Sequence, residues 1–168
     1  MQTLGSDLEG LRKQLEEGSV QRAYNAILTY MSRLRAGFAS SRADQLVSGL
    51  YQGAFDMTYF ALIPPALKAR ELKLAIVFDY SSFRFQVWLA ARNRDVQRRY
   101  WGLLRNNGWT GYPLVEPAVG IDAITVDDVA SGLELERPER LTAEIESAVS
   151  RFGGEVERFL ADCDPRAV

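Results

Sequence analysis

The sequence contains no histidine, and this absence excludes much familiar chemistry. Ser-His-Asp and Cys-His nucleophilic sites, proton transfer by imidazole near neutral pH and histidine-ligated zinc sites all require that residue. A catalytic site would therefore have to use carboxylates, lysine, tyrosine or a bound metal. The composition thus favours a binding protein over an enzyme.

Cysteine occurs once, as Cys163, so the chain cannot form an internal disulfide or a cysteine-rich metal site. The longest apolar stretches, Leu74–Phe78 and Val87–Ala91, are far shorter than the roughly 20 residues of a membrane span. The N-terminus lacks a basic start followed by an apolar block, so we expect no secretory signal. Together these absences predict a cytoplasmic protein with no membrane partner.

The length of 168 residues and the 47% hydrophobic content are those of one globular domain, so residues 1–168 are expected to form a single domain. The net charge of −2 conceals an uneven distribution. Residues 1–115 hold 15 Lys and Arg against 9 Asp and Glu, whereas residues 116–164 hold 4 against 13. This polarity predicts internal charge matching, and the alternative is an anionic partner bound by the basic part.

Two amphipathic helices are predicted at the N-terminus. The first begins at a capping box formed by Ser6 and Glu9, carries a short leucine stripe and ends at Gly18. The second begins at Ser19 and repeats apolar residues at every third or fourth position up to Phe38. The second helix is therefore expected to pack on a core.

The period of the apolar residues then changes to two, which predicts strands. The expected strands are Leu46–Tyr51, Phe55–Leu62, Leu72–Phe78 and Phe83–Leu89. The last two flank the polar turn Tyr80-Ser81-Ser82 and are expected to form an antiparallel hairpin. The connection Ala66–Arg70 is expected to form one helical turn.

Helical periodicity returns in the C-terminal half. Residues 93–106 are expected to form an arginine-rich helix, residues 109–123 a loop, and Ala123–Val129 a short strand. A final amphipathic helix spans Glu139–Asp162, and Gly153-Gly154 is expected to kink or break it because each glycine costs about 1 kcal/mol of helix propensity. The predicted fold class is α+β, with an N-terminal helix pair, an antiparallel sheet of about four strands, a helix and a C-terminal amphipathic helix or helix pair.

Several separated blocks of the sequence resemble one family. They are Tyr51-Gln52-Gly53, Phe55–Phe60, Leu72–Phe78, Arg84–Ala90 and Tyr100-Trp101. Over residues 15–112 the chain is similar to an uncharacterised family of small, stand-alone bacterial proteins, a domain of unknown function. The resemblance implies a soluble bacterial protein and assigns no activity, ligand or site residue.

One set of residues resembles a catalytic pattern. Restriction-type nucleases place an Asp on one strand and an acidic-x-Lys sequence on the next, and Asp56, Glu71 and Lys73 follow that order. In such sites two carboxylates hold Mg²⁺ while the lysine stabilises charge on the phosphate. Residues 71 and 73 point to the same face of a strand, so the geometry permits this site. The alternative is a set of solvated charges at the edge of a strand.

The polar face of the predicted sheet is a second candidate site. Its expected residues are Asp56, Thr58, Lys73, Arg84, Gln86 and Trp88. Charged residues in the middle of strands indicate that this face is not wholly buried. It would form a shallow groove in which Arg84, Trp88, Lys73 and Arg92 bind a ligand. The alternative is an ordinary solvent-exposed face of an antiparallel sheet.

The arginine-rich helix lies near Trp101, Trp109 and Tyr112 in the sequence, a combination that suits phosphate contact and base stacking. The patch is small and the whole chain is slightly acidic, so we do not expect nucleic-acid binding. Trp101 is expected to pack the helix onto the sheet instead. A homodimer joined through helix surfaces is a further alternative.

The leading hypothesis from the sequence is a small cytoplasmic binding or regulatory module. It would use the polar sheet face and the arginine-rich helix to bind an anionic small molecule or an acidic protein surface. The alternative is a metal-dependent phosphodiesterase or nuclease-like enzyme that uses Asp56, Glu71 and Lys73. No cofactor is expected, and no metal in the leading case, because the spaced acids of residues 122–128 lack the order of a calcium loop.

Overall fold

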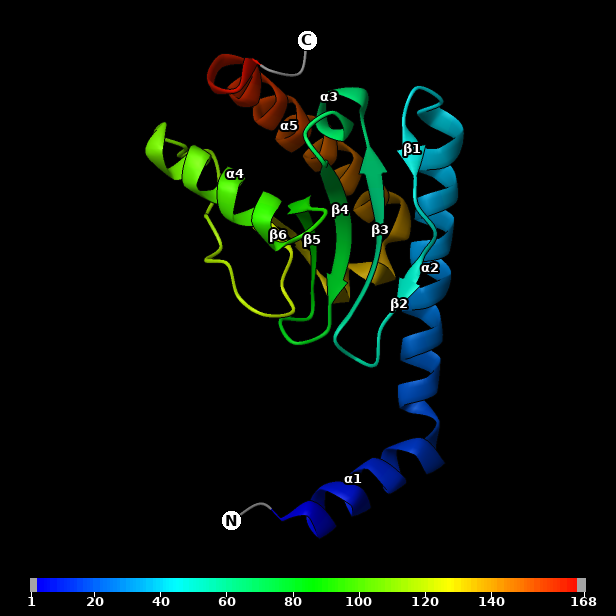
Figure 1. Cartoon of the computed structure of the whole chain (residues 1–168). Coiled ribbons are helices and arrows are strands. Elements are labelled where there is room, and N and C mark those ends of the chain that lie inside the picture. The colour runs from blue at the N-terminus through cyan, green and yellow to red at the C-terminus, as the bar shows by residue number, and fades with distance from the viewer. Residues whose placement is uncertain (1–2, 166–168) are drawn as a thin grey trace.

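A computed structural model describes residues 3–165 and shows an α+β fold built on a six-stranded antiparallel sheet (Figure 1). The strands are β1 (Leu46–Val47), β2 (Tyr51–Gln52), β3 (Met57–Ile63), β4 (Leu72–Asp79), β5 (Arg84–Ala91) and β6 (Ala123–Ser131). Their order is β1-β3-β4-β5-β6, and β2 also pairs with β3. The predicted fold class is confirmed, although the number of strands is six rather than about four. The predicted strand Leu46–Tyr51 is divided into two short ones, and β6 is longer than expected.

Helices form at each of the predicted positions, and one short 3₁₀ helix was not predicted. They are α1 (Leu4–Glu17), α2 (Ser19–Ser41), α3 (Pro65–Lys68), α4 (Arg94–Asn106), the 3₁₀ helix η1 (Gly132–Glu136) and α5 (Pro138–Cys163). The predicted capping box is wrong, because the N-cap of α1 is Thr3, whose side chain accepts a 3.3 Å hydrogen bond from the Ser6 N–H. Glu9 pairs with Arg12 instead.

The last helix runs without interruption from Pro138 to Cys163, so no break occurs at Gly153-Gly154. A Cβ atom at Gly153 would lie 2.9 Å from a methyl carbon of Leu74, whereas one at Gly154 would meet nothing within 4 Å. Gly153 therefore lets α5 approach β4 closely. The packing gained along the helix outweighs the roughly 1 kcal/mol of propensity that each glycine loses.

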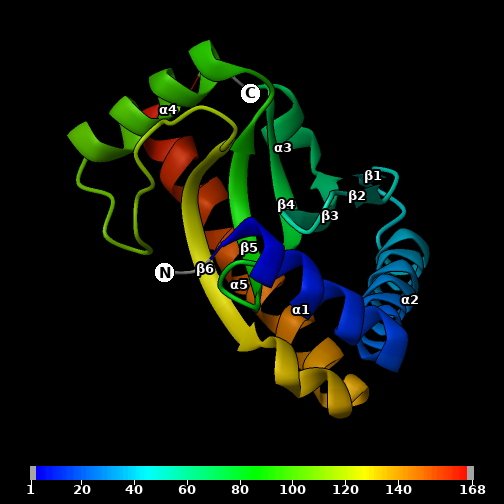
Figure 2. The same ribbon diagram turned by 90° about the horizontal axis from the view of Figure 1, so that it is seen from below.

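The core lies between the sheet and the two long helices α2 and α5 (Figures 1 and 2). Its largest fully buried side chains include Phe38, Phe60, Phe78, Phe85, Phe152 and Met31. Tyr30 of α2 packs edge-on against Phe85 at 5.5 Å, and its hydroxyl lies 3.1 Å from that of Thr142 in α5. Burial of each such side chain contributes about 1.5–3 kcal/mol, so this layer fixes which face of the sheet is covered.

The residues of β3 that face the core are the ones that were expected on the polar face of the sheet. Thr58 was expected on the polar face but is fully buried opposite Phe78, with its hydroxyl 3.0 Å from the Tyr80 hydroxyl. The bond to Tyr80 satisfies the polar group that would otherwise exclude Thr58 from the core. Phe60 therefore faces the core, and Tyr59 lies on the open face.

The two outer edges of the sheet differ from uninterrupted, unpaired edge strands. At one edge, β1 and β2 hold only two residues each and are separated by residues 48–50. At the other edge, residues 113–115 run beside β6, where the Val115 N–H donates to the Ile124 carbonyl at 2.9 Å and the Val126 N–H to the Pro113 carbonyl at 3.2 Å. Residues 113–115 thus pair with the first half of β6, and the opposite edge of the sheet is interrupted.

A buried ion pair joins α3 to the end of α5. The Arg70 guanidinium lies 3.5 Å from the Asp164 carboxylate and donates to the Asp164 and Ala66 carbonyls at 2.7 and 2.9 Å. The Tyr100 hydroxyl of α4 donates to the same carboxylate at 2.7 Å. Three elements are thus tied together by charged and polar groups that are almost entirely buried.

This network predicts a loss of stability at alkaline pH. Burial, followed by the bond to Asp164, raises the pKa of Tyr100 from 10.0 to about 12. A folded-state pKa above the unfolded value stabilises the protein below pH 10, and that stability is lost as the pH rises towards 12. In urea titrations across this range, Tyr100→Phe should show a shallower decline in unfolding free energy than the unchanged protein. Some decline should persist in the variant, because burial also raises the pKa of Tyr30 to about 12. If unfolding free energy fell equally steeply with pH in both proteins, Tyr100 would not be a source of the alkaline loss of stability.

Candidate functional site

The face of the sheet opposite α2 and α5, here called the outer face, contains a narrow hollow. Its floor is made of small residues, Ala75, Val77 and Ala90, and larger side chains of β3 and β5 stand on either side. The full lining is Met57, Tyr59, Lys73, Ala75, Val77, Trp88, Ala90, Gly120 and Asp122. The cavity volume is about 30 Å³, well below the roughly 300–1,000 Å³ of pockets that bind small molecules. The hollow therefore admits one chemical group and cannot enclose a whole metabolite.

A chain of hydrogen bonds holds the side chain of Trp88 in place at one side of the hollow. The Trp88 indole N–H donates to the side-chain oxygen Oε1 of Gln86 at 2.8 Å, and the side-chain amide of Gln86 donates to Asp128 at 2.9 Å. The second oxygen of Asp128 lies 3.0 Å from Nε of Arg84. The prediction that Arg84, Gln86 and Trp88 share one face is confirmed. Because Asp128 compensates the charge of Arg84, Arg84 is less suited to binding an external anion.

Lys73 is the cation of the hollow. Its ammonium nitrogen lies 5.7 Å from the centre of the Tyr59 ring, within the range of a cation–π contact. Within residues 3–165, no carboxylate lies within ion-pair distance of Lys73. Burial, the Asp122 carboxylate and Tyr51 raise the pKa of Tyr59, so the loop places a negative charge near the same ring.

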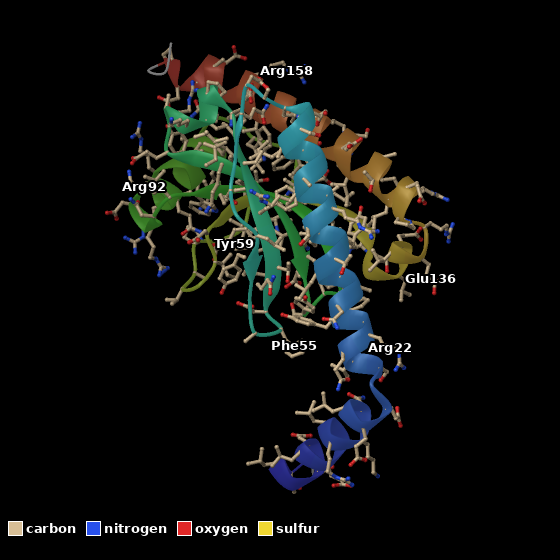
Figure 3. All side chains as sticks on the ribbon, turned by 90° about the vertical axis from the view of Figure 1, so that its right-hand side faces the viewer. Arg22, Phe55, Tyr59, Arg92, Glu136 and Arg158 are labelled. Carbon is tan, nitrogen blue, oxygen red and sulfur yellow. The ribbon has the colours of Figure 1, made fainter. Side chains whose placement is uncertain are left out.

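The other predicted binding residue, Arg92, is paired outside the hollow. It projects from the side of the molecule that carries Tyr59 (Figure 3) and lies 2.9 Å from the Glu71 carboxylate. Arg92 and Lys73 share one end of the sheet, because Leu72 pairs with Ala91. Arg84 lies at the other end, opposite Asp79. Of the four predicted ligand-binding residues, the structure thus brings Lys73 and Trp88 together and places Arg84 and Arg92 apart from them.

The structure does not assemble the predicted nuclease-like site. Asp56 precedes Met57, which pairs with Asp79, whereas Glu71 precedes the first residue of β4. The two residues thus lie at opposite ends of an eight-residue strand, whose backbone is about 25 Å long at 3.3 Å per residue. Across residues 3–165, no three His, Cys, Asp or Glu side chains form a group that could hold a metal ion.

The aromatic residues near the arginine-rich helix α4 are used for packing. Trp109 contacts Phe159 of α5 with ring centres 5.0 Å apart, and Tyr112 contacts Phe152 at 4.8 Å. Arg105 lies over the Trp101 ring at 5.0 Å. Trp109 and Tyr112 therefore fasten the loop after α4 to α5, an arrangement that does not favour base stacking.

Sequence reasoning did not identify Gly120 and Asp122 as part of the hollow. Their loop is anchored by Gln97, a buried residue of α4 whose amide donates to the Ile121 and Ala123 carbonyls at 2.7 and 3.0 Å. The glycine and proline content of residues 109–123 predicts only a loop. No local signal shows that the loop folds back towards the outer face.

Comparisons with known proteins place the chain in a family. Searches of curated proteins and of solved structures find no match. Among residues 3–165, no helix combines the length and the apolar character that crossing a membrane would require. A family model matches residues 4–160, which extends beyond the similarity seen over residues 15–112 and includes most of the acidic C-terminal part. The chain therefore belongs to the family described as Domain of unknown function (DUF7000).

Proposed function

We propose that the protein is a binding module whose outer face takes an acidic protein segment, with one carboxylate placed at Lys73 between Tyr59 and Trp88. The observation that carries this proposal is the lack of an ion-pair partner for Lys73 within residues 3–165. Arg84 and Arg92 each have a carboxylate at about 3 Å, so Lys73 is better placed to accept an external anion.

The size of the hollow supports a protein segment over an enclosed small molecule. Pockets that bind drug-sized molecules have volumes of roughly 300–1,000 Å³, whereas the cavity volume here is about 30 Å³. A ligand would lie across the face and insert a single group. Tyr59 and Trp88 would contact the stem of that group while Lys73 binds its charged end, and charge-assisted hydrogen bonds of this kind contribute about 1.5–3 kcal/mol.

Titration with a short glutamate-rich peptide tests this proposal. Lys73→Gln should weaken binding about tenfold, because a lost contact of about 1.4 kcal/mol changes the dissociation constant by that factor. Lys68→Gln is the matched control, since Lys68 is an exposed lysine of α3 outside the hollow. Affinity should also fall with added salt.

A glutamine-rich peptide and inorganic phosphate serve as further probes. If phosphate bound more tightly than the peptide, the ligand of the outer face would be a phosphate-bearing small molecule and not an acidic protein segment. Equal binding by Lys73→Gln and Lys68→Gln, or no binding of any acidic probe, would remove the outer face from the proposed function.

We further propose that this module acts in the cytoplasm of a bacterium. The single cysteine supports a reducing compartment, because Cys163 has no second cysteine with which to form an internal disulfide. The similarity of residues 15–112 to small bacterial proteins supports the source.

A further inference from the structure

Helix α1 carries an apolar stripe that nothing in the described chain covers. Figures 1 and 2 show α1 projecting away from the rest of the molecule beneath one end of the sheet. None of its residues is buried, and its four leucines are 42–74% exposed. They are Leu4, Leu8, Leu11 and Leu15, whose spacing of four, three and four residues places them on one side of the helix. An isolated helix of fewer than about 12–15 residues is marginal in water, so a helix this short needs a surface to pack on.

A second uncovered apolar surface lies at the end of the sheet above α1. The turns β2–β3 and β4–β5 meet there, because the Tyr80 N–H donates to the Asp56 carbonyl at 3.1 Å. The start of η1 joins them through a 2.8 Å bond from the Gly132 N–H to the Phe83 carbonyl. Large apolar side chains project at this end, and Figure 3 shows one of them, Phe55. We call Phe55 (59% exposed), Phe83 (41%) and Leu133 (73%) the turn-end patch.

The backbone of the turn-end patch is strained. Phe55 has φ +62° and Phe83 has φ +55°, in the left-handed region that bulky residues rarely adopt. Conformations of this kind are energetically unfavourable and persist where the surroundings impose them, often at functional sites. Phe55 is also supported from beneath by Tyr24 and Tyr80, with ring centres 5.0 and 5.8 Å away. Two phenylalanines are therefore held in exposed positions at a conformational cost.

The exposed areas match those of a stable dimer. With ordinary side-chain areas, the leucine stripe and the turn-end patch together expose roughly 800 Å² per copy, which is the contribution of each partner to a standard interface. The stripe alone supplies about half of that area, so pairing of two α1 helices would fall short. Docking of each stripe on the partner's patch buries both surfaces in both copies.

We infer that two copies of this chain form a two-fold dimer in which α1 of each copy packs its leucine stripe on the turn-end patch of the other. Each copy supplies one helix and one patch, so the interface is self-complementary and closes after two copies. Gly18, with φ +71°, directs α1 away from its own body and leaves the helix available to a partner.

The charge of α1 favours a second copy over a lipid surface. The helix holds four acidic residues, Asp7, Glu9, Glu16 and Glu17, against two basic ones, Arg12 and Lys13. Helices that lie on membranes are typically rich in Lys and Arg, which are attracted to anionic headgroups. An acidic helix lacks this attraction.

Sedimentation and light scattering over a concentration series up to about 100 μM, within the range where weak dimers become visible, test the inference. The unchanged protein should be dimeric, and Leu8→Glu or Leu11→Glu should each raise the dissociation constant about 10–100-fold, because the dimer loses two half-exposed leucines, one from each copy. Phe83→Ser should do the same from the other side of the interface. The matched control is Val119→Glu, because Val119 is 87% exposed and lies outside both surfaces. All variants should keep the circular dichroism of the body, since none of these residues is buried.

Cross-linking identifies which surfaces meet. In a Cys163→Ser background, a chain with Leu11→Cys is mixed with a chain with Phe83→Cys under mild oxidation, and the inference predicts disulfides between the two different chains. Links only between two Leu11→Cys chains would overturn it in favour of helix pairing. A monomer at every concentration, a dimer unaffected by Leu8→Glu, or a monomer that binds anionic vesicles through α1 would also overturn it.

Discussion

Arg70→Ala is expected to reduce the free energy of unfolding by about 3–5 kcal/mol, because it breaks a buried ion pair and removes the hydrogen bonds that Arg70 donates to buried carbonyls. The Asp164 carboxylate is 3% exposed, so it would lose the guanidinium charge in a site that water hardly reaches. Helix α3 and the end of α5 would loosen together, since Arg70 binds the carbonyls of Ala66 in α3 and of Leu160 and Asp164 at the end of α5.

Urea denaturation followed by circular dichroism measures this effect. The matched control is Arg92→Ala, which removes an ion pair to Glu71 at the surface and should cost no more than about 1 kcal/mol. A double-mutant cycle with Asp164→Ala should give a favourable coupling energy between the two residues. If the Arg70→Ala and Arg92→Ala variants were equally stable, the buried Arg70–Asp164 pair would stabilise the fold no more than the surface Arg92–Glu71 pair does.

Gly153→Leu is expected to destabilise the protein by about 1–3 kcal/mol, whereas Gly154→Ala should stabilise it by about 0.5–1 kcal/mol. The opposite signs follow from the position of each glycine on α5. Any side chain at position 153 meets Leu74 at 2.9 Å from its first carbon, and position 154 has no neighbour within 4 Å. The added Cβ at position 154 only improves helix propensity.

Thermal and urea unfolding of the two single variants provides the comparison. Because the glycines are adjacent on the same helix, each variant serves as the control for the other. If both variants were destabilised by similar amounts, the backbone of α5 would need glycine at both positions. The contact with Leu74 would then not explain the effect of Gly153→Leu.

The hairpin β4–β5 and helix α2 could be predicted from the sequence because their apolar periods are regular and local. The facing of β3 could not, since both of its alternating rows contain large apolar residues. Phe60 lies on one row and Met57 and Tyr59 lie on the other, so period alone does not choose the buried side. The choice depends on the Thr58–Tyr80 contact, which joins residues 22 positions apart.

The candidate site was predicted in part for a related reason. Lys73 and Trp88 were placed on one face by the hairpin register, which a two-residue period determines. Asp122 could not be assigned to that face, because its position depends on Gln97 and on the fold of a long loop. The Arg70–Asp164 pair joins residues 94 positions apart and left no pattern in the sequence.

The interrupted strands at one edge and residues 113–115 at the other affect how the molecule can associate. An intact edge strand offers a row of N–H and C=O groups on which further chains add as in amyloid. Here that row is broken into pairs at β1 and β2 and is engaged by Pro113 and Val115 beside β6. Addition of further strands at the β1–β2 edge and at the first half of β6 is therefore disfavoured, which leaves side-chain surfaces as the means by which these parts of the molecule can associate.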